Sequence, residues 1–322
     1  MKIFSLVASA FALSACGGFT PSTPAAPTAQ LPQFAAPKHA TVRIFTANRN
    51  ANSIIAFGTK ANGNVAPAVV IAGSQTALSQ PDSLALDAKG NIYTADDGGT
   101  QVVVFAADAN GNVKPKKTIG GSKSHLGPTE GLFVDPSGNL WVSDFQNDAV
   151  TEYAAGAKGN AKPINMIGGN NTLLDSPTGI TMDKSGRLFV ASTFSAAVVG
   201  FASGASGNAT PAVNISGSNT GLKDPFAIGF DSKGRLLVAD EDAGVLVFAA
   251  GANGNVAPLA TITGISSADG VVADSKNHIW AAGYGGPINE YASNVNGAAK
   301  PLRSIGGSKT TIDGANYLAF QH

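Results

Sequence analysis

The fold is decided by residues 90–115, which read GNIYTADDGGTQVVVFAADANGNVKP. Copies of this unit recur six times after residue 40. Each copy has an aromatic residue that closes a β-rich run, and these residues are Phe57, Phe105, Tyr153, Phe201, Phe248 and Tyr291. Four of the five intervals between them are 47 or 48 residues, and one is 43. A repeat of this length, with four short strand-like segments, predicts the blades of a β-propeller.

Two turn signals recur in the copies. An Asp-x-x-Gly turn occurs at Asp87, Asp135, Asp183 and Asp231. Aspartate can bond to its own backbone and glycine accepts a positive φ, so this turn predicts a tight hairpin between the first two strands. A small residue followed by glycine comes six residues after each aromatic, as in Asn62-Gly63. It predicts a short hairpin between the third and fourth strands.

The two ends of the repeat region complement each other. The first copy begins at residues 43–47, the counterpart of a second strand, and no first strand precedes it. The missing piece is at the C-terminus, where ANYLAFQ at 315–321 aligns with PDSLALD at 81–87. We therefore expect an all-β fold over residues 41–322, a six-bladed β-propeller in which the C-terminal strand completes the first blade.

The charge balance excludes one class of partner. The chain has 322 residues with 21 Lys plus Arg and 21 Asp plus Glu, so its formal net charge is zero. No overall charge draws it onto nucleic acid, and we expect no nucleic-acid partner. A single cysteine rules out an internal disulfide framework.

The first forty residues predict export and anchoring. Residues 1–15 have a lysine, a short apolar stretch and a small-residue site, which is the layout of a signal peptide. Leu13-Ser14-Ala15-Cys16 resembles the bacterial lipobox, which implies cleavage before Cys16 and acylation of that residue. The alternative is a plain signal peptide with a chance cysteine. Residues 16–40 are rich in Pro, Ala and Thr and predict an extended tether. We expect a cell-envelope protein with a lipid anchor in the membrane, the outer membrane in a Gram-negative cell.

One copy carries a family resemblance. Pro177-Thr178-Gly179-Ile180, Asp183, Gly186 and 188–191 resemble the PxGIxxDxxGxLxVA core of NHL-repeat propellers. The resemblance covers 41–322 and implies the fold. It leaves function open, because NHL-like and related propellers include lactonases, lyases, RNA binders and extracellular binding proteins. The copy between Thr263 and Val271 departs from the pattern, since it lacks several residues and its proline.

One register of the repeat predicts a ring of side chains at the mouth of the axial channel. Its members are Asp82, Glu130, Thr178, Phe226, Asp269 and Asn316. Asp82, Glu130, Asp269 and Asn316 supply oxygen ligands that suit a hard divalent cation, Ca²⁺ or Mg²⁺. Gluconolactonase-like propellers resemble this in having an acidic and amide metal site at the same place. The alternative is that these side chains only hydrate the mouth and cap turns.

The loops at the same end predict an acidic face with aromatic rings. The residues singled out as a ligand-binding face are Asp96, Asp144, Phe145, Phe194, Asp240 and Tyr284. RNA-binding relatives need a basic face, so this composition argues against that role. Catalytic signals are few: only His125 is placed to reach this face, while His278 follows a hairpin at a surface position. We assign no catalytic residue.

Three functional hypotheses remain open. The first is a lipoprotein, expected to be a monomer, whose propeller is a binding or scaffold module for a protein, peptide or saccharide. The second is a metal-dependent lactonase or lyase of the gluconolactonase-like or virginiamycin B lyase-like type, working at the channel mouth. The third is a purely structural role. Dependence of an activity on a divalent metal distinguishes the second from the others.

Overall fold

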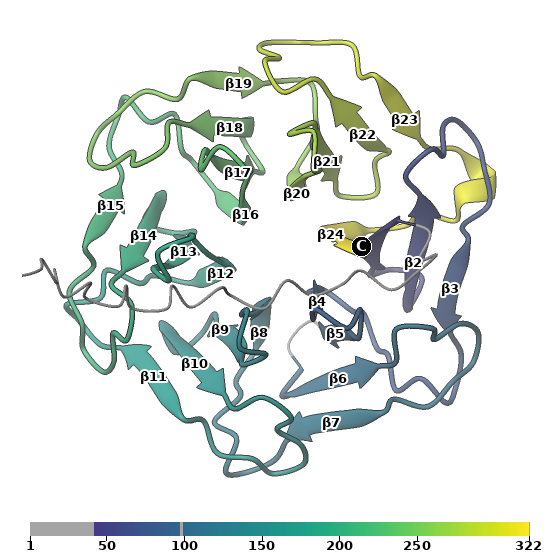
Figure 1. Ribbon diagram of the computed structural model, residues 1–322, viewed down its shortest axis with the longest axis horizontal. Coiled ribbons are helices and arrows are strands. Elements are labelled where there is room, and N and C mark those ends of the chain that lie inside the picture. The colour runs from purple at the N-terminus through teal and green to yellow at the C-terminus, as the bar shows by residue number, and fades with distance from the viewer. Residues whose placement is uncertain (1–41, 97–98, 322) are drawn as a thin grey trace, which may run out of the picture. The chain divides into compact units, whose positions relative to one another are not determined.

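The structure is a computed structural model that describes residues 42–96 and 99–321. Within these residues, six four-stranded antiparallel sheets are arranged as a ring around a central axis (Figure 1). The predicted all-β, six-bladed propeller is confirmed. No helix in the described part is long and apolar enough to span a membrane; the element η1 (Ser308–Thr310) is one turn of 3₁₀-helix.

Each blade runs from an inner strand near the axis to an outer strand at the rim (Figure 1). Blade 1 consists of β24 (Ala315–Gln321), β1 (Arg43–Asn48), β2 (Ser53–Gly58) and β3 (Val69–Ala72). Blade 2 consists of β4 (Ala85–Leu86), β5 (Ile92–Ala95), β6 (Gln101–Phe105) and β7 (Lys117–Gly120). Blade 3 consists of β8 (Thr129–Val134), β9 (Leu140–Asp144), β10 (Ala149–Tyr153) and β11 (Asn165–Gly168).

The other three blades repeat this order. Blade 4 consists of β12 (Pro177–Met182), β13 (Leu188–Ser192), β14 (Ala197–Phe201) and β15 (Val213–Ile215). Blade 5 consists of β16 (Pro225–Phe230), β17 (Leu236–Asp240), β18 (Gly244–Phe248) and β19 (Ala260–Ile262). Blade 6 consists of β20 (Ala268–Ala273), β21 (Ile279–Gly283), β22 (Ile288–Tyr291) and β23 (Arg303–Ile305).

The C-terminal strand completes blade 1, as the sequence predicts. β24 pairs antiparallel with β1, from Arg43 opposite Gln321 to Asn48 opposite Ala315. The first and last strands of the ring are therefore neighbours in one sheet, and neither leaves an open edge there.

The core lies between neighbouring blades, because the middle strands are buried on both faces. All residues of β9, β13, β17 and β21 are buried. The six aromatics that mark the repeat lie at the ends of the third strands and are also buried, so they belong to this core. Full burial of one such ring stabilises the fold by about 1.5–3 kcal/mol.

The Asp-x-x-Gly turn forms the predicted hairpin between the first and second strands. In blade 2, Asp87 Oδ1 accepts the N–H groups of Lys89 and Asn91 at 2.9 and 2.8 Å. Gly90 has φ +78°, a conformation that glycine adopts without strain. The end of the ring that carries these turns is called the hairpin end below.

The prediction for the small-Gly turn is wrong in detail. Third and fourth strands do pair, but residues 59–68 separate β2 from β3. The turn reaches back to the preceding blade instead: the Gly111 N–H donates to the Val70 carbonyl at 2.6 Å, and Asn112 Oδ1 accepts the Gln75 N–H at 2.8 Å. We call this pair of contacts the interblade clip. Its partner strand is remote in sequence, so local turn propensity does not reveal it.

Candidate functional site

The predicted register does converge on the axis, at the end of the ring opposite the hairpins. Asp82 lies three residues before β4, and Asp269 and Asn316 lie in β20 and β24; each of the three is 3% exposed. A β-bulge interrupts the pairing of the inner strand at this point, as between Ala268 and Gly270. A bulge re-aims the side chain it contains, here Asp269.

Asp82 is held by residues of blade 1. The Asn316 side-chain amide donates a hydrogen bond to Asp82 Oδ1. Arg49 Nε lies 3.5 Å from the same oxygen in an ion pair. One predicted carboxylate and the predicted amide are therefore in direct contact, with a guanidinium beside them.

Three buried polar atoms next to this contact have no hydrogen-bond partner among the residues that the structure describes. They are Asp269 Oδ1, Asn316 Oδ1 and the Tyr317 hydroxyl. All three residues are at most 6% exposed. A buried acceptor without a donor costs about 1–3 kcal/mol, so this arrangement is open to a ligand that supplies positive charge.

Burial and like charges raise the pKa values of the acidic groups here. Burial, followed by the carboxylates of Glu241, Asp82 and Asp224, raises the pKa of Asp269 to about 8, and the Arg49 guanidinium acts against them. The pKa of Glu241 is raised by burial and then by Asp224 and other neighbours. We define the axial cluster as the residues linked by these contacts and fields: Arg49, Asp82, Glu130, Asp224, Glu241, Asp269, Asn316 and Tyr317.

The remaining sector of the ring is closed by internal bonds. The hydroxyls of Thr178 and Thr193 lie 3.0 Å apart, and Thr178 also donates to the Phe226 carbonyl at 3.0 Å. The Phe226 ring packs on Tyr317 with centroids 5.3 Å apart. The carboxylates of the axial cluster therefore come from blades 2, 3, 5 and 6, and blade 1 contributes Arg49, Asn316 and Tyr317.

Sequence reasoning missed several members of the cluster. Arg49 and Glu241 occupy one register, the first residue after the second strand of their blades, which Phe145, Thr193 and Tyr284 share. Aligning the copies one residue past that strand reveals this second ring. Tyr317 and Asp224 carry no comparable signal.

The three carboxylates predicted for the ligand face hold loops in place. Asp240 is fully buried, and its oxygens accept the N–H groups of Lys223, Asp224, Asp242 and Ala243. Asp96 Oδ1 accepts the Ser79 N–H at 3.0 Å. Asp144 accepts the backbone N–H of Asn147 with Oδ1 and the side-chain amide of Asn147 with Oδ2. In the structure each of these carboxylates hydrogen-bonds to a loop. Contact of these residues with a ligand stays a prediction.

The predicted aromatics are more accessible. Phe194 is 71% exposed, and its ring meets Phe145 edge to face with centroids 5.5 Å apart. Tyr284 is exposed and donates from its hydroxyl to Asn50 Oδ1 at 2.8 Å. These rings lie at the end of the propeller that carries the axial cluster, opposite the hairpin end, because their loops follow β9, β13 and β21. We call it the axial end. Cys16 and the predicted signal and tether lie outside the described residues.

Comparison with known proteins supports the fold and no more. No family model matches the chain, and no curated protein matches it. A protein of unknown function from Bacteroides caccae is similar with TM-score 0.62 and 12% identity, over 87% of this chain and 99% of that one. A chain of a nidogen/laminin complex has TM-score 0.61 and 15% identity, over 87% and 98%. A streptogramin B lyase has TM-score 0.54 and 12% identity, over 78% and 76%.

Proposed function

We propose that the chain is a membrane-anchored extracytoplasmic lipoprotein whose propeller is a binding module. In this proposal the axial cluster receives a cation, either Ca²⁺ or Mg²⁺ or a positively charged group on a protein, peptide or saccharide. The anchor is the acylated Cys16, and the exposed ring of Phe194, with the half-buried ring of Phe145, adds apolar contact area beside the cluster.

The observation that carries this proposal is the state of Asp269. Within residues 42–96 and 99–321, neither Asp269 Oδ1 nor Asn316 Oδ1 has a hydrogen-bond donor, although both atoms are buried. The axial cluster contains five carboxylates and one guanidinium, so its charge is unbalanced toward negative. A bound cation satisfies both oxygens and removes the repulsion that raises the pKa of Asp269.

Calorimetry with two probes tests the binding proposal. Ca²⁺ represents a metal, and agmatine represents a guanidinium group. We expect at least one probe to bind the wild-type chain and to lose at least tenfold in affinity with Asp269→Asn. Asp242→Asn removes an exposed carboxylate at the same end and serves as the matched control, with a change below about twofold. Absence of heat and of thermal shift with both probes contradicts the proposal, since ligand binding must stabilise the native state.

A metal-dependent lactonase or lyase is a second candidate, favoured by one observation. The pKa of Asp269 lies near neutrality, and a catalytic acid or base works best in that range. The similarity to streptogramin B lyase concerns the fold alone. Turnover of a lactone or cyclic ester that requires a divalent metal and disappears with Asp269→Asn favours this candidate, whereas metal binding without turnover favours the binding module.

Membrane anchoring has its own test. We expect Cys16→Ser to move the chain from the membrane fraction to the soluble fraction of cells, or to block its maturation, because a lipid chain needs that thiol. A variant that still sediments with the membrane shows that Cys16 is not the anchor, and leaves the binding proposal intact.

A further inference from the structure

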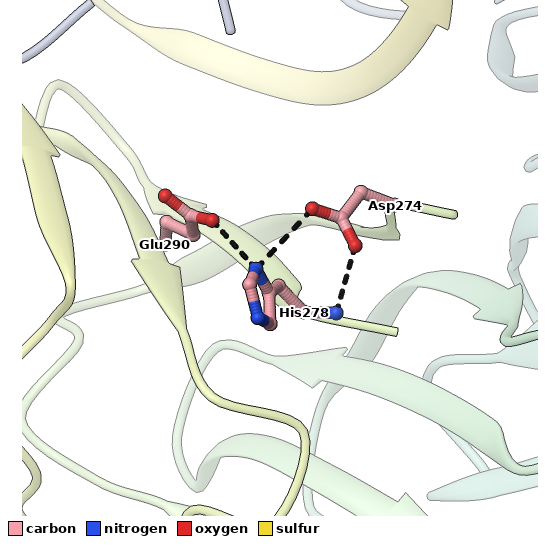
Figure 2. Close-up of side chains that lie close together, drawn as sticks. All are labelled: Asp274, His278 and Glu290. Atoms are coloured by element: carbon pink, nitrogen blue, oxygen red, sulfur yellow. Dashed lines mark hydrogen bonds and ion pairs between the residues drawn. The ribbon is translucent and has the colours of Figure 1, made fainter. Parts of the chain in front are cut away.

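A second polar cluster lies at the hairpin end of blade 6 (Figure 2). Asp274 follows β20, His278 precedes β21 and Glu290 lies in β22. One ligand atom from each of the three lies within 4.8 Å of the others. Asp269 lies near the start of β20 and Asp274 follows its end, so this cluster is separate from the axial cluster.

The three side chains meet at one imidazole nitrogen. His278 Nδ1 lies 2.7 Å from Glu290 Oε1 and 3.4 Å from Asp274 Oδ2 (Figure 2). Two ligands bound to one Zn²⁺ at about 2.1 Å lie about 3.0–3.4 Å apart at octahedral or tetrahedral angles. The separation from Asp274 lies within this range, and the separation from Glu290 is shorter, at hydrogen-bond distance, so the Glu290 carboxylate must move away from Nδ1 by a few tenths of an ångström to admit the ion.

The fold holds the other oxygen of each carboxylate. Asp274 Oδ1 accepts the N–H groups of Lys276 and His278 at 2.8 and 2.9 Å. Glu290 Oε2 lies 3.2 Å from Arg303 Nε, and Arg303 also donates to the Thr59 carbonyl. One oxygen of each carboxylate is thus anchored while the other faces Nδ1. Outer contacts of this kind orient the ligands of a metal site.

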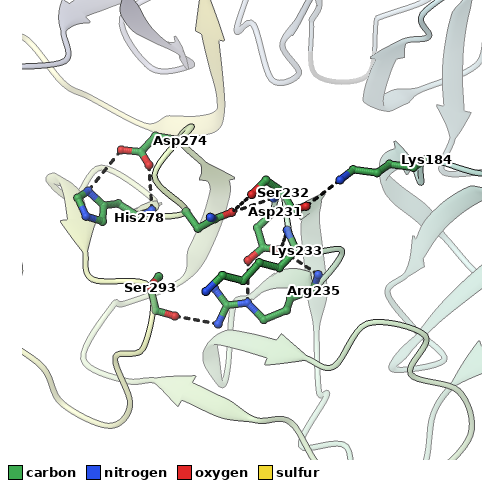
Figure 3. A network of polar contacts seen from close by, with 9 residues as sticks. Lys184, Asp231, Ser232, Lys233, Arg235, Asp274, His278 and Ser293 are labelled. Atoms are coloured by element: carbon green, nitrogen blue, oxygen red, sulfur yellow. Dashed lines mark hydrogen bonds and ion pairs between the residues drawn. The ribbon is translucent and has the colours of Figure 1, made fainter.

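The hairpin that carries His278 is itself braced by its neighbours (Figure 3). Asn277 Oδ1 accepts the N–H and hydroxyl of Ser232 at 2.8 and 2.7 Å. Lys184 Nζ donates to the Ser232 carbonyl at 2.7 Å, which joins the hairpins of blades 4, 5 and 6. The imidazole therefore stands on a fixed backbone, as a preorganised site requires.

We propose that Asp274, His278 and Glu290 bind a divalent transition-metal ion such as Zn²⁺. An imidazole with two carboxylates suits zinc and its neighbours, whereas Ca²⁺ and Mg²⁺ prefer oxygen alone. Three protein ligands leave a coordination position open. The same three residues line a cleft of about 220 Å³ with Lys60, Lys276 and Arg303. These cations make water or a small anion the fourth ligand.

Blade 3 shows what the same cluster is without the histidine. Asn139 occupies the position of His278 and donates to Glu152 Oε1 at 2.8 Å. Trp141 Nε1 lies 3.5 Å from Asp135 Oδ2, as Trp280 Nε1 lies 3.5 Å from Asp274 Oδ2. An amide is therefore sufficient for the hydrogen bond that supports the glutamate. The imidazole of blade 6 adds a nitrogen that can bind metal.

Titration of the full-length chain with Zn²⁺ tests the site, and Cys16→Ser is carried in every arm so that no thiolate competes. We expect one site with an affinity in the micromolar range or tighter. His278→Asn converts the cluster to the form seen in blade 3, keeps the bond to Glu290 and should weaken binding at least tenfold. Asn139→His should add a second site and raise the stoichiometry from one to two.

Co²⁺ gives an independent readout, because its visible absorption reports nitrogen and oxygen ligands in low coordination. We expect this absorption in the parent chain and its loss in His278→Asn. Absence of Zn²⁺ binding in the parent overturns the proposal, as does unchanged affinity in His278→Asn. If that variant fails to fold, an unchanged stoichiometry in Asn139→His overturns it. Binding of Ca²⁺ at the axial cluster is scored separately and does not bear on this result.

Discussion

Asp269 and Asp274 lie at the two ends of the same inner strand, β20, and differ in how their carboxylate oxygens are hydrogen-bonded. Asp274 accepts two backbone N–H groups with one oxygen, and its other oxygen faces His278 and Trp280. Asp269 has a buried oxygen with no donor, and burial and neighbouring carboxylates raise its pKa. The same residue type closes a hairpin at one end and remains unsatisfied at the other.

This difference distinguishes aspartates that stabilise the fold from polar side chains that are available for binding. At the hairpin end, one pattern of backbone hydrogen bonds recurs, and one carboxylate oxygen of each aspartate holds the turn: Asp87, Asp135, Asp183, Asp231 and Asp274. At the axial end the equivalent position holds a different side chain in nearly every blade. Changes at the hairpin end should therefore lower stability, and changes at the axial end should alter charge and binding.

The largest effect is expected for Asp231→Ala at the hairpin end. The Asp231 side chain is fully buried and accepts bonds from the backbone of Lys233 and Arg235 and from the Arg235 guanidinium at 2.7 Å. Its loss leaves a largely buried cation without its partner, which costs about 3–5 kcal/mol. Urea unfolding measures this.

Asp183→Ala is the matched control for that change. Asp183 makes the same contacts with Arg187, but their side chains are 14% and 38% exposed. We expect a loss of about 1 kcal/mol, because solvent screens the pair. Equal losses in the two variants show that burial does not set the strength of the hairpin lock.

Asp269→Asn should have the opposite sign. The folded state keeps a proton on Asp269 up to about pH 8, whereas the unfolded chain releases it near pH 4. Wild-type stability should fall as the pH rises through that interval, because the folded state then binds the extra proton. At pH 9, with a chelator present, the variant should be more stable by roughly 1–3 kcal/mol. Below pH 4 the advantage should vanish, and a loss of stability at pH 9 contradicts this account.

Asp274→Asn has a small expected effect and sharpens the comparison between the two ends of β20. Asparagine keeps one acceptor oxygen for the two N–H groups, but its amide meets the Trp280 N–H that faced Asp274 Oδ2. We expect a loss of about 1 kcal/mol in metal-free buffer at pH 9. The same substitution would then stabilise one end of β20 and destabilise the other. A gain at both ends would show that relief of negative charge outweighs the hairpin bonds.

Much of the fold followed from the repeat because propeller geometry brings equal registers to equal places. That rule placed Asp82, Asp269 and Asn316 near the axis and identified β24 as the missing strand of blade 1. The same alignment did not reveal that Asp240 is enclosed by the backbone of its own loops. An acidic residue in a loop has the same sequence signature whether it caps N–H groups or meets solvent.

Other parts of the site depend on contacts that no local pattern records. The bond between Asn316 and Asp82 joins residues 234 positions apart. The sequence indicates a surface position after a hairpin for His278 and does not reveal the cluster of blade 6. Its partners Glu290 and Arg303 lie on later strands, and only pairing of β21 with β22 and of β22 with β23 brings them together.

The interblade clips and the closing strand β24 differ in the sequence separation of the residues that they join, and this difference bears on folding. A clip bond such as that between Asn112 and Gln75 joins residues 37 positions apart, so blades 2 to 6 can each attach to the preceding blade soon after forming. Closure instead joins Thr46 to Asn316, 270 positions apart. Contacts of such long range are slow to form, because a large loop must close first. We therefore expect the inner edge of β1 to stay unpaired until β24 binds to it. Ring closure should then be the slow step of folding and the stage most prone to aggregation.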